Sequence, residues 1–195
     1  MRFSTREVRD LFFAWILLSV AFTILFTNFS DLLVANILMF FMVSLITVGL
    51  GFLLHELAHK FVAQGYGLWA EFKASYGMLM VAIGLSFLGF IFAAPGGVYI
   101  HGLITKEKNG KISLAGPVTN IILAGLFLVP LLLLNSTGIA QLIFSYGFRI
   151  SALLALFNMI PVMPLDGAKV LAWSKKAYWT TITISALLFI GSFFI

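Results

Sequence analysis

The sequence contains no cysteine, so disulfide bonds and metal sites built on thiolates are both excluded. Charged residues are also scarce: they make up 10% of the 195 positions, whereas a soluble domain carries roughly a quarter. The net charge of +5 does not indicate nucleic-acid binding, because no dense basic patch with interleaved aromatic residues occurs. What the chain has in abundance is apolar sequence, at 62% of all residues. The composition therefore excludes a soluble globular domain and indicates a protein in contact with membrane lipid.

The apolar residues lie in long runs, and a run of about 20 is what a helix needs to cross about 30 Å of hydrocarbon. The N-terminal residues resemble a signal peptide, but no small-residue cleavage pattern follows, so we interpret the first run as a retained helix. We predict an all-α polytopic membrane protein of one domain, residues 1–195, with about five transmembrane helices. The predicted spans are Leu11–Asn28, Leu32–Ala63, Ile112–Leu134, Ile139–Pro161 and Ala177–Ile195.

The region between the second and third spans has a different pattern. Ala70–Tyr76 alternates apolar and polar residues, which is typical of a half-exposed strand. Ala94–Ile100 begins with a Pro-Gly-Gly turn and continues as a second strand candidate. Between them, Gly77–Ala94 is apolar but short and rich in glycine. We predict a re-entrant or β-hairpin element here, which dips into the membrane without crossing it.

The distribution of lysine and arginine supports this arrangement. If the N-terminus is cytoplasmic and Gly77–Ala94 does not cross, every Lys and Arg except Arg149 falls on the cytoplasmic side. The outer loops Phe29–Asp31 and Asn135–Gly138 then carry no positive charge. We therefore predict a multi-pass protein of the cell membrane with a cytoplasmic N-terminus. Arg149 is best explained by snorkelling to the outer interface.

Two of the three histidines flank a glutamate in the second span, as His55-Glu56-Leu57-Ala58-His59. Residues four apart lie on one face of a helix, so His55 and His59 can bind one tetrahedral metal ion. Glu56 can then reach the water on that metal and take its proton. An ionisable residue inside a membrane protein is costly and indicates function. The pattern predicts one zinc ion per chain with Glu56 as the catalytic base.

A catalytic zinc needs a third protein ligand and an open fourth position. The remaining histidine, His101, lies in the second strand candidate and is better explained by a strand-edge or loop role. Asp166 is the stronger candidate, although an aspartate before a glycine is also common in turns. From Leu33 to His55 is about 33 Å of helix, and from Arg149 to Asp166 about 26 Å. His55 and Asp166 therefore reach similar depths in the membrane, which favours Asp166 as the third ligand.

The chain resembles the site-2 protease family of intramembrane metalloproteases. Three motifs carry the resemblance: His55-Glu56-x-x-His59, Ala115-Gly116-Pro117-Val118-Thr119-Asn120, and Asn158-x-x-Pro161-x-x-Pro164-Leu165-Asp166-Gly167. They fall in a catalytic core of about residues 32–167. The Pro-Gly-Gly at 95–97 is similar to the membrane-associated β-hairpin of that family. No segment resembles the PDZ or CBS domains that control access of substrate in many members.

The resemblance implies a zinc-dependent endopeptidase that cuts single transmembrane helices of membrane proteins. It implies zinc binding by His55, His59 and Asp166, with Glu56 as general base. It also implies that Asn158, and less directly Asn120, contacts the substrate backbone or the tetrahedral intermediate. From the residues alone, an interhelical hydrogen bond explains Asn120 equally well.

Two other functions use the same residues. A zinc transporter or metal sensor would need the ligands but not a glutamate placed as base, and would carry more carboxylates along a path through the membrane. A catalytically silent scaffold would be expected to lack the glutamate or a ligand, and both are present here. The sequence leaves the substrate and the oligomeric state open.

Overall fold

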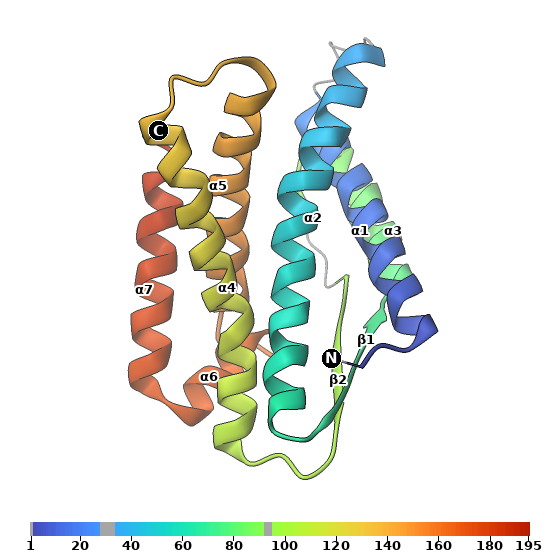
Figure 1. Ribbon diagram of the computed structural model, residues 1–195, viewed down its shortest axis with the longest axis vertical. Helices are drawn as coiled ribbons and strands as arrows, with labels where there is room; N and C mark the ends of the chain where they lie inside the picture. The colour runs from blue at the N-terminus through green and yellow to red at the C-terminus, as the bar shows by residue number, and fades with distance from the viewer. Residues whose placement is uncertain (1, 28–33, 92–94) are drawn as a thin grey trace.

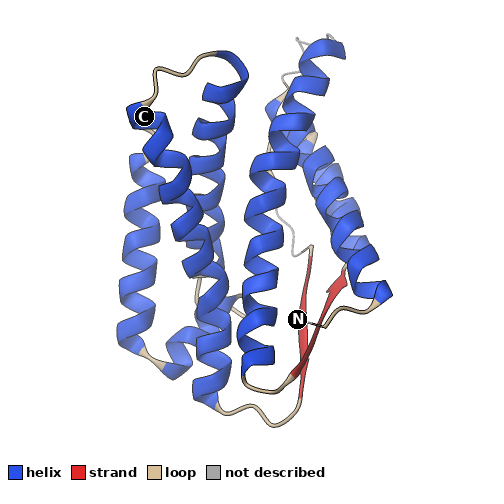
Figure 2. Ribbon diagram, in the orientation of Figure 1, coloured by secondary structure: helices blue, strands red, loops and turns tan. Residues whose placement is uncertain are grey.

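The computed structural model describes residues 2–27, 34–91 and 95–195. Within these residues, seven helices and a two-stranded sheet follow one another as α1, α2, β1, α3, β2, α4, α5, α6 and α7. Figure 1 shows the long helices running side by side, with the sheet next to the lower part of α2. Figure 2 shows the two strands as one small sheet in an otherwise helical structure.

The central helix is α2 (Val34–Gly65), which at 32 residues is about 48 Å long. It contacts α1, α4, α5 and both strands, so its lower half is surrounded by other elements. The helix stops before a turn in which Gly67 has a φ of +74°, a left-handed conformation that favours glycine. The His, Glu and His side chains of the His-Glu-x-x-His motif are buried in this part of α2.

The first helix, α1 (Thr5–Phe26), begins after Ser4, whose hydroxyl accepts a hydrogen bond from the Glu7 N–H. It packs along α2 through Trp15. A Cβ on Gly49 would lie 1.8 Å from Trp15 Nε1, so the indole occupies the space that the glycine leaves free. The same Nε1–H donates to the Leu45 carbonyl at 2.9 Å. Close approach at a small residue is typical of helix contacts in membranes.

The sheet pairs β1 (Trp69–Ala74) with β2 (Gly96–His101) in antiparallel register, with Ala74 opposite Gly96. Between the strands lies α3 (Tyr76–Ser86), whose 11 residues span about 16 Å, roughly half of the hydrocarbon thickness. Because Ala74 and Gly96 are paired, the segment between them starts and returns at one level. The predicted β-hairpin pairing is thus confirmed, whereas re-entry into the membrane stays a prediction, and residues 92–94 of Gly77–Ala94 lie outside the described part.

The outer edge of β1 is closed by two carboxylates of α1. Glu7 accepts a hydrogen bond from the Phe72 N–H at 2.9 Å, and Asp10 accepts one from the Ala74 N–H at 3.2 Å. Asp10 also accepts a hydrogen bond from the Tyr76 hydroxyl at 2.8 Å, at the start of α3. Acidic side chains of the first helix therefore hold the strand where a third strand would otherwise pair.

The second half of the chain forms a helical layer beside α2. The helices α4 (Lys106–Leu133) and α5 (Gly138–Asn158) lie antiparallel, in contact where Phe127 fills the space above Gly147. A short loop from Met159 leads to α6 (Asp166–Trp173), which packs against α4, and α7 (Lys175–Gly191) packs against α5. The chain thus returns to α2 at the level of its histidines.

The all-α polytopic fold predicted from the sequence is confirmed. In the described residues, the four helices α1, α2, α4 and α5 are long and apolar enough to cross a membrane. The fifth predicted span, Ala177–Ile195, corresponds to α7, which ends earlier, at Gly191; its 17 residues are at the lower limit for a crossing, and it is not among these four helices. The predicted outer loop Phe29–Asp31 lies outside the described residues.

Two helices begin clearly earlier than predicted, and the first is α1, which starts at Thr5, six residues before the expected Leu11. The third span was expected to begin at Ile112, but α4 begins six residues earlier, at Lys106. Thr105 caps this helix, because its hydroxyl accepts a hydrogen bond from the Lys108 N–H at 3.2 Å. Hydropathy marks only the part of a helix that is apolar, whereas the cap determines where the helix starts.

Candidate metal centre

His55 and His59 lie one turn apart on α2 and point in the same direction. Their Nε2 atoms are 3.0 Å apart, and their rings meet nearly at right angles, at 87°. Both side chains are buried. Two imidazole nitrogens therefore converge on one point inside the protein, as the helical spacing predicts.

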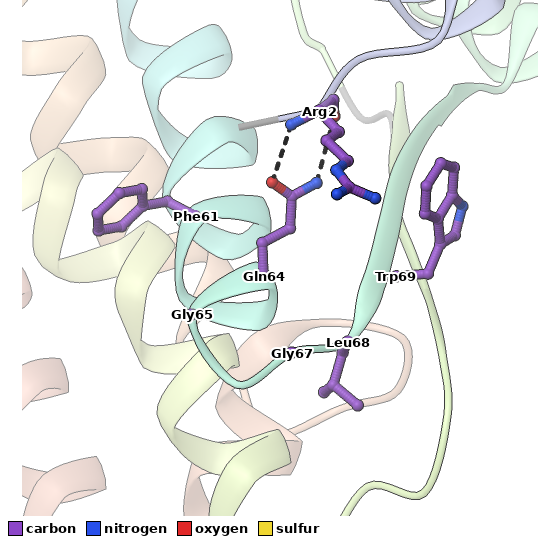
Figure 3. A pocket seen from close by; sticks show the side chains of 7 residues that line it. All are labelled: Arg2, Phe61, Gln64, Gly65, Gly67, Leu68 and Trp69. Carbon is purple, nitrogen blue, oxygen red and sulfur yellow. Dashed lines mark hydrogen bonds between the residues drawn. The ribbon is translucent and has the colours of Figure 1, made fainter.

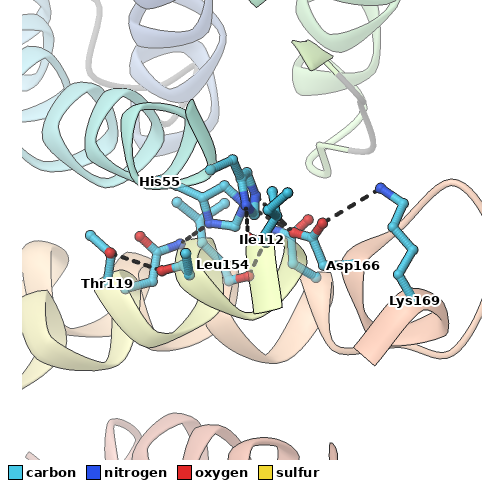
Figure 4. Close-up of polar contacts among 10 residues, drawn as sticks. His55, Ile112, Thr119, Leu154, Asp166 and Lys169 are labelled. Carbon is cyan, nitrogen blue, oxygen red and sulfur yellow. Dashed lines mark hydrogen bonds and ion pairs between the residues drawn. The ribbon is translucent and has the colours of Figure 1, made fainter. Parts of the chain in front are cut away.

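Asp166 reaches the same point from a different element. It is the first residue of α6, and its Oδ2 lies 3.3 Å from His55 Nε2 and 3.1 Å from His59 Nε2 (Figure 4). Two ligand atoms of a tetrahedral zinc are about 3.3 Å apart, because each lies about 2.0–2.2 Å from the metal. Among the described residues, these three form the group of His, Asp and Glu side chains that can hold a metal ion. One zinc ion fits their donor set and spacing.

The carboxylate of Asp166 is available as an anionic ligand. Burial alone would raise its pKa, but the charge of His59 and the hydrogen bonds from both histidines outweigh burial and hold the pKa below its usual range. Lys169 contributes a more distant contact, with its Nζ 3.7 Å from Asp166 Oδ1.

The loop that carries Asp166 is fixed by close backbone contacts. A Cβ on Gly167 would lie 2.2 Å from the Met159 carbonyl oxygen, so only glycine lets α6 begin this close to the end of α5. Pro161 and Pro164 prevent the preceding residues from forming a regular helix. The Pro-Leu-Asp-Gly sequence thus places its aspartate next to a helix that lies more than 100 residues earlier in the chain.

Glu56 follows His55 in the sequence, so its side chain projects from an adjacent face of α2. It is buried, and its Oε2 has no hydrogen-bond partner in the described part of the chain. A buried polar atom without a partner is costly and indicates that water or a ligand completes the site. This free carboxylate oxygen is the group that the sequence assigns to proton transfer.

Asn120 also lies at the site, but it contacts Nδ1 of His55, whereas Asp166 lies against Nε2 of the same ring. It is fully buried on α4, and its side-chain nitrogen lies 3.0 Å from His55 Nδ1. The interhelical hydrogen bond that the sequence offered as an explanation is therefore present. Asn158 is half-buried at the end of α5, where its side-chain nitrogen donates to the Leu154 carbonyl of the same helix at 2.9 Å.

His101 lies apart from this group. It is exposed at the end of β2, opposite Trp69. The expectation of a strand-edge position for this histidine is confirmed.

Sequence reasoning missed one residue at the centre. A Cβ on Gly116 of α4 would lie 2.5 Å from Nε2 of His55 and 2.5 Å from Nε2 of His59. The backbone of α4 therefore directly faces the two histidine nitrogens that could bind a metal. The signal was the Ala-Gly-Pro motif, whose glycine indicates a close approach only once its neighbours are known.

A separate cavity of about 580 Å³ lies at the end of α2. Figure 3 shows the Gln64 side chain hydrogen-bonded to the backbone of Arg2 at one side of this cavity. Trp69 lies at the other side. None of the six predicted site residues lines it. The cavity is therefore distinct from the candidate metal centre.

The fold and the site together define a polytopic membrane protein with a buried candidate metal centre of two histidines and one aspartate. The chain is 45% identical over 175 residues to "Putative zinc metalloprotease MJ0611" of Methanocaldococcus jannaschii, covering 89% of this chain and 87% of that protein. It is 32% identical over 149 residues to "Putative zinc metalloprotease YwhC" of Bacillus subtilis, covering 65% and 66%. It is 28% identical over 156 residues to "Zinc metalloprotease MJ0392" of Methanocaldococcus jannaschii, covering 79% and 40%.

The chain belongs to this family of zinc metalloproteases. No model of a known protein family matches the chain, and no solved structure matches it significantly.

Proposed function

We propose that the chain is an intramembrane zinc endopeptidase of the site-2 protease family, which cuts transmembrane helices of membrane proteins. The observation that carries the proposal is the meeting of His55, His59 and Asp166 beside Glu56 on a helix long enough to cross a membrane. A metalloprotease motif on such a helix would allow hydrolysis of substrate segments that lie inside the membrane.

The metal ligands would be the three converging atoms of His55, His59 and Asp166. When bound, zinc supplies Lewis-acid chemistry, which polarises a carbonyl group and lowers the pKa of water to about 7. Three side chains would hold the zinc, which is the number of protein ligands in catalytic zinc sites.

Glu56 would act as the general base. Its partnerless Oε2 is free to accept the proton of the attacking water. The same carboxyl group can then deliver this proton to the nitrogen of the leaving amine. Burial of Glu56 restricts exchange of that proton with bulk solvent.

The centre would lie toward the cytoplasmic end of the membrane. Counted from Val34, His55 lies about 32 Å down α2, at the end where the sheet packs. The same end carries positive charge at the starts of α4 and α7, including Lys106, Lys175 and Lys176. By the positive-inside rule this end faces the cytoplasm of a cell membrane, and so does the N-terminus.

The proposed substrate is a transmembrane segment that unwinds to be cut, and the free edge of β2 offers it a partner. Phe72 lies opposite Val98 in the sheet, and the Phe72 N–H donates to Glu7 of α1 instead of to β2. Phe72 and Val98 are therefore a non-hydrogen-bonded pair of the antiparallel ladder. In such a pair, the N–H and C=O groups of Val98 face away from β1. Among the described residues, the Val98 N–H has no backbone partner. Because β1 is closed by Glu7 and Asp10, an extended substrate would add to β2, which packs against α2.

Two further assignments complete the proposal. Asn158, at the start of the loop that carries Asp166, is the candidate for contact with the substrate backbone. Lipid would surround the outward-facing apolar surface of the bundle.

The alternative of a zinc transporter gains no support from the other acidic residues. Glu7 and Asp10 are used to hold β1, and Glu107 pairs with Lys111 at the exposed start of α4. In the described part of the chain, no second group of metal-binding side chains marks a path through the membrane.

The proposal is tested by reconstituting the purified protein in liposomes with single-span membrane proteins and mapping the products by mass spectrometry. Cleavage inside the hydrophobic segment of a substrate is expected. Cleavage that is confined to soluble peptides would contradict the intramembrane assignment.

A further inference from the structure

One face of α4 lies against the outer side of the metal centre. Ile112, Gly116 and Asn120 are spaced by four residues, so they form a single stripe on the helix. Each of the three lies against one or both of the candidate ligand histidines, and Figure 4 shows Ile112 beside this group. Gly116 and Asn120 of this stripe belong to the Ala115–Asn120 motif, to which the proposed mechanism gives no role.

The orientation of the two histidine rings determines which hydrogen-bonding groups this stripe must provide. Nε2 of each histidine faces Asp166, so Nε2 is the atom that would bind a metal. A neutral imidazole that binds through Nε2 carries its proton on Nδ1, and that N–H needs an acceptor. For His59 the acceptor is present, because the Ile112 carbonyl oxygen lies 2.7 Å from Nδ1.

For His55 the neighbouring group is the amide of Asn120. Its nitrogen lies 3.0 Å from His55 Nδ1, while its Oδ1 is buried and has no partner in the described part of the chain. Rotation of the amide by 180° exchanges the two atoms and places the acceptor against Nδ1. The residue can therefore meet the requirement of a metal-bound His55 without any movement of the backbone.

Gly116 lies between these two contacts. A methyl group at this position would stand 2.5 Å from Nε2 of both histidines, which is far inside van der Waals contact. The rings have little freedom to withdraw, because Ile112 and Asn120 hold their opposite sides. The absence of a side chain at Gly116 therefore keeps the space beside the metal-binding nitrogens open.

We propose that this stripe of α4 positions both zinc-binding histidines, with Asn120 Oδ1 accepting a hydrogen bond from His55 Nδ1–H in the zinc-loaded protein. In this role Asn120 is a positioning residue that acts through His55, and Gly116 preserves the room that the metal needs. The inference deepens the proposed function, since it rests on the same zinc centre. It does not depend on the substrate.

The test for Asn120 compares two substitutions in the purified full-length chain, with zinc affinity measured by competition with a chelator. Asn120→Leu removes the acceptor and should weaken zinc binding by about 10- to 100-fold, as is typical for groups that orient metal ligands. Asn120→Asp keeps an acceptor and should stay close to wild type. If Asn120→Leu does not purify, Asn120→Ala gives the same comparison.

Two results would overturn the role of Asn120. Equal loss of zinc affinity in the Asp and Leu variants would mean that the residue does not act as an acceptor. Unchanged affinity in Asn120→Leu together with a raised KM would assign the residue to substrate binding instead. Absence of zinc from the wild-type protein would be a different result, because it would refute the proposed function itself.

Gly116 has a matched control in the same helix. Gly116→Ala should abolish zinc binding, whereas Gly125→Ala should leave it unchanged, because a Cβ on Gly125 meets no atom within 4 Å. Zinc content and the melting temperature in detergent are measured for both. Retention of a full zinc equivalent in Gly116→Ala would show that the space beside the histidines is not required.

Discussion

Lys60 and Glu7 form a buried ion pair that joins α2 to α1, one residue after the candidate metal ligand His59. Each side chain is 1% exposed. The second oxygen of Glu7 accepts a hydrogen bond from the Phe72 N–H, so one carboxylate connects two helices and a strand. The contact fixes the sheet against the part of α2 that carries the catalytic motif.

Loss of one partner of this pair should destabilise the protein. Lys60→Met leaves the Glu7 carboxylate buried and without its counter-charge, at an expected cost of about 3–5 kcal/mol in the free energy of unfolding. Thermal unfolding in detergent measures the effect as a lower melting temperature. The double variant Glu7→Gln with Lys60→Met should recover part of the loss, because it removes both charges and keeps an acceptor for Phe72.

The exposed pair of Glu107 and Lys111 is the control for this experiment. These side chains also form a lysine–glutamate contact, at 2.6 Å, but on the surface of α4. Lys111→Met should leave the melting temperature close to that of wild type, because exposed ion pairs contribute little. An equal fall in melting temperature for Lys60→Met and Lys111→Met would show that burial of the Lys60 pair does not matter.

Metal content tests the three proposed ligands. The purified protein should carry about one zinc per chain, and His55→Ala, His59→Ala and Asp166→Ala should each lose it. His101→Ala is the matched control, because that histidine is exposed on β2 and should not affect zinc. Full zinc content in Asp166→Ala would remove this aspartate from the ligand set.

Labelling of single cysteines tests the membrane topology, and the chain has no native cysteine to interfere. Cysteines that replace Lys73, Asn109 and Lys175 should be protected from an impermeant thiol reagent in intact cells and should react after lysis. A cysteine that replaces Ser136 should react from outside. The cysteine-free parent protein is the control. Labelling of position 109 but not position 73 from outside would mean that the segment between β1 and β2 crosses the membrane.

Much of the fold could be predicted because membranes impose simple rules on sequence. Length and apolarity identified α1, α2, α4 and α5, and the distribution of lysine indicated that Gly77–Ala94 returns to its starting side. The pairing of Ala74 with Gly96 brings the two ends of the segment together, as that prediction requires. The start of α4 was missed, because the charged turn that Thr105 caps carries no hydropathy signal.

The candidate site was predictable to a different extent for different residues. The spacing of His55 and His59 follows from helical geometry, and depth along two helices brought Asp166 to the same level. The contacts of Glu7 and Asp10 with β1 could not be predicted, since they join residues more than 60 positions apart with no shared motif. The role of Gly116 was also hidden, because a close approach is visible only when its neighbours have been placed.

The most direct test of the account measures zinc content and proteolysis together in Glu56→Gln. This substitution keeps the size and shape of the side chain but removes the base, so zinc should stay at about one per chain. Cleavage of a transmembrane substrate in liposomes should fall by about two orders of magnitude or more, as is typical when a general base is removed. Cleavage at near the wild-type rate with zinc still bound would contradict the central claim that Glu56 performs the proton transfer of an intramembrane zinc protease.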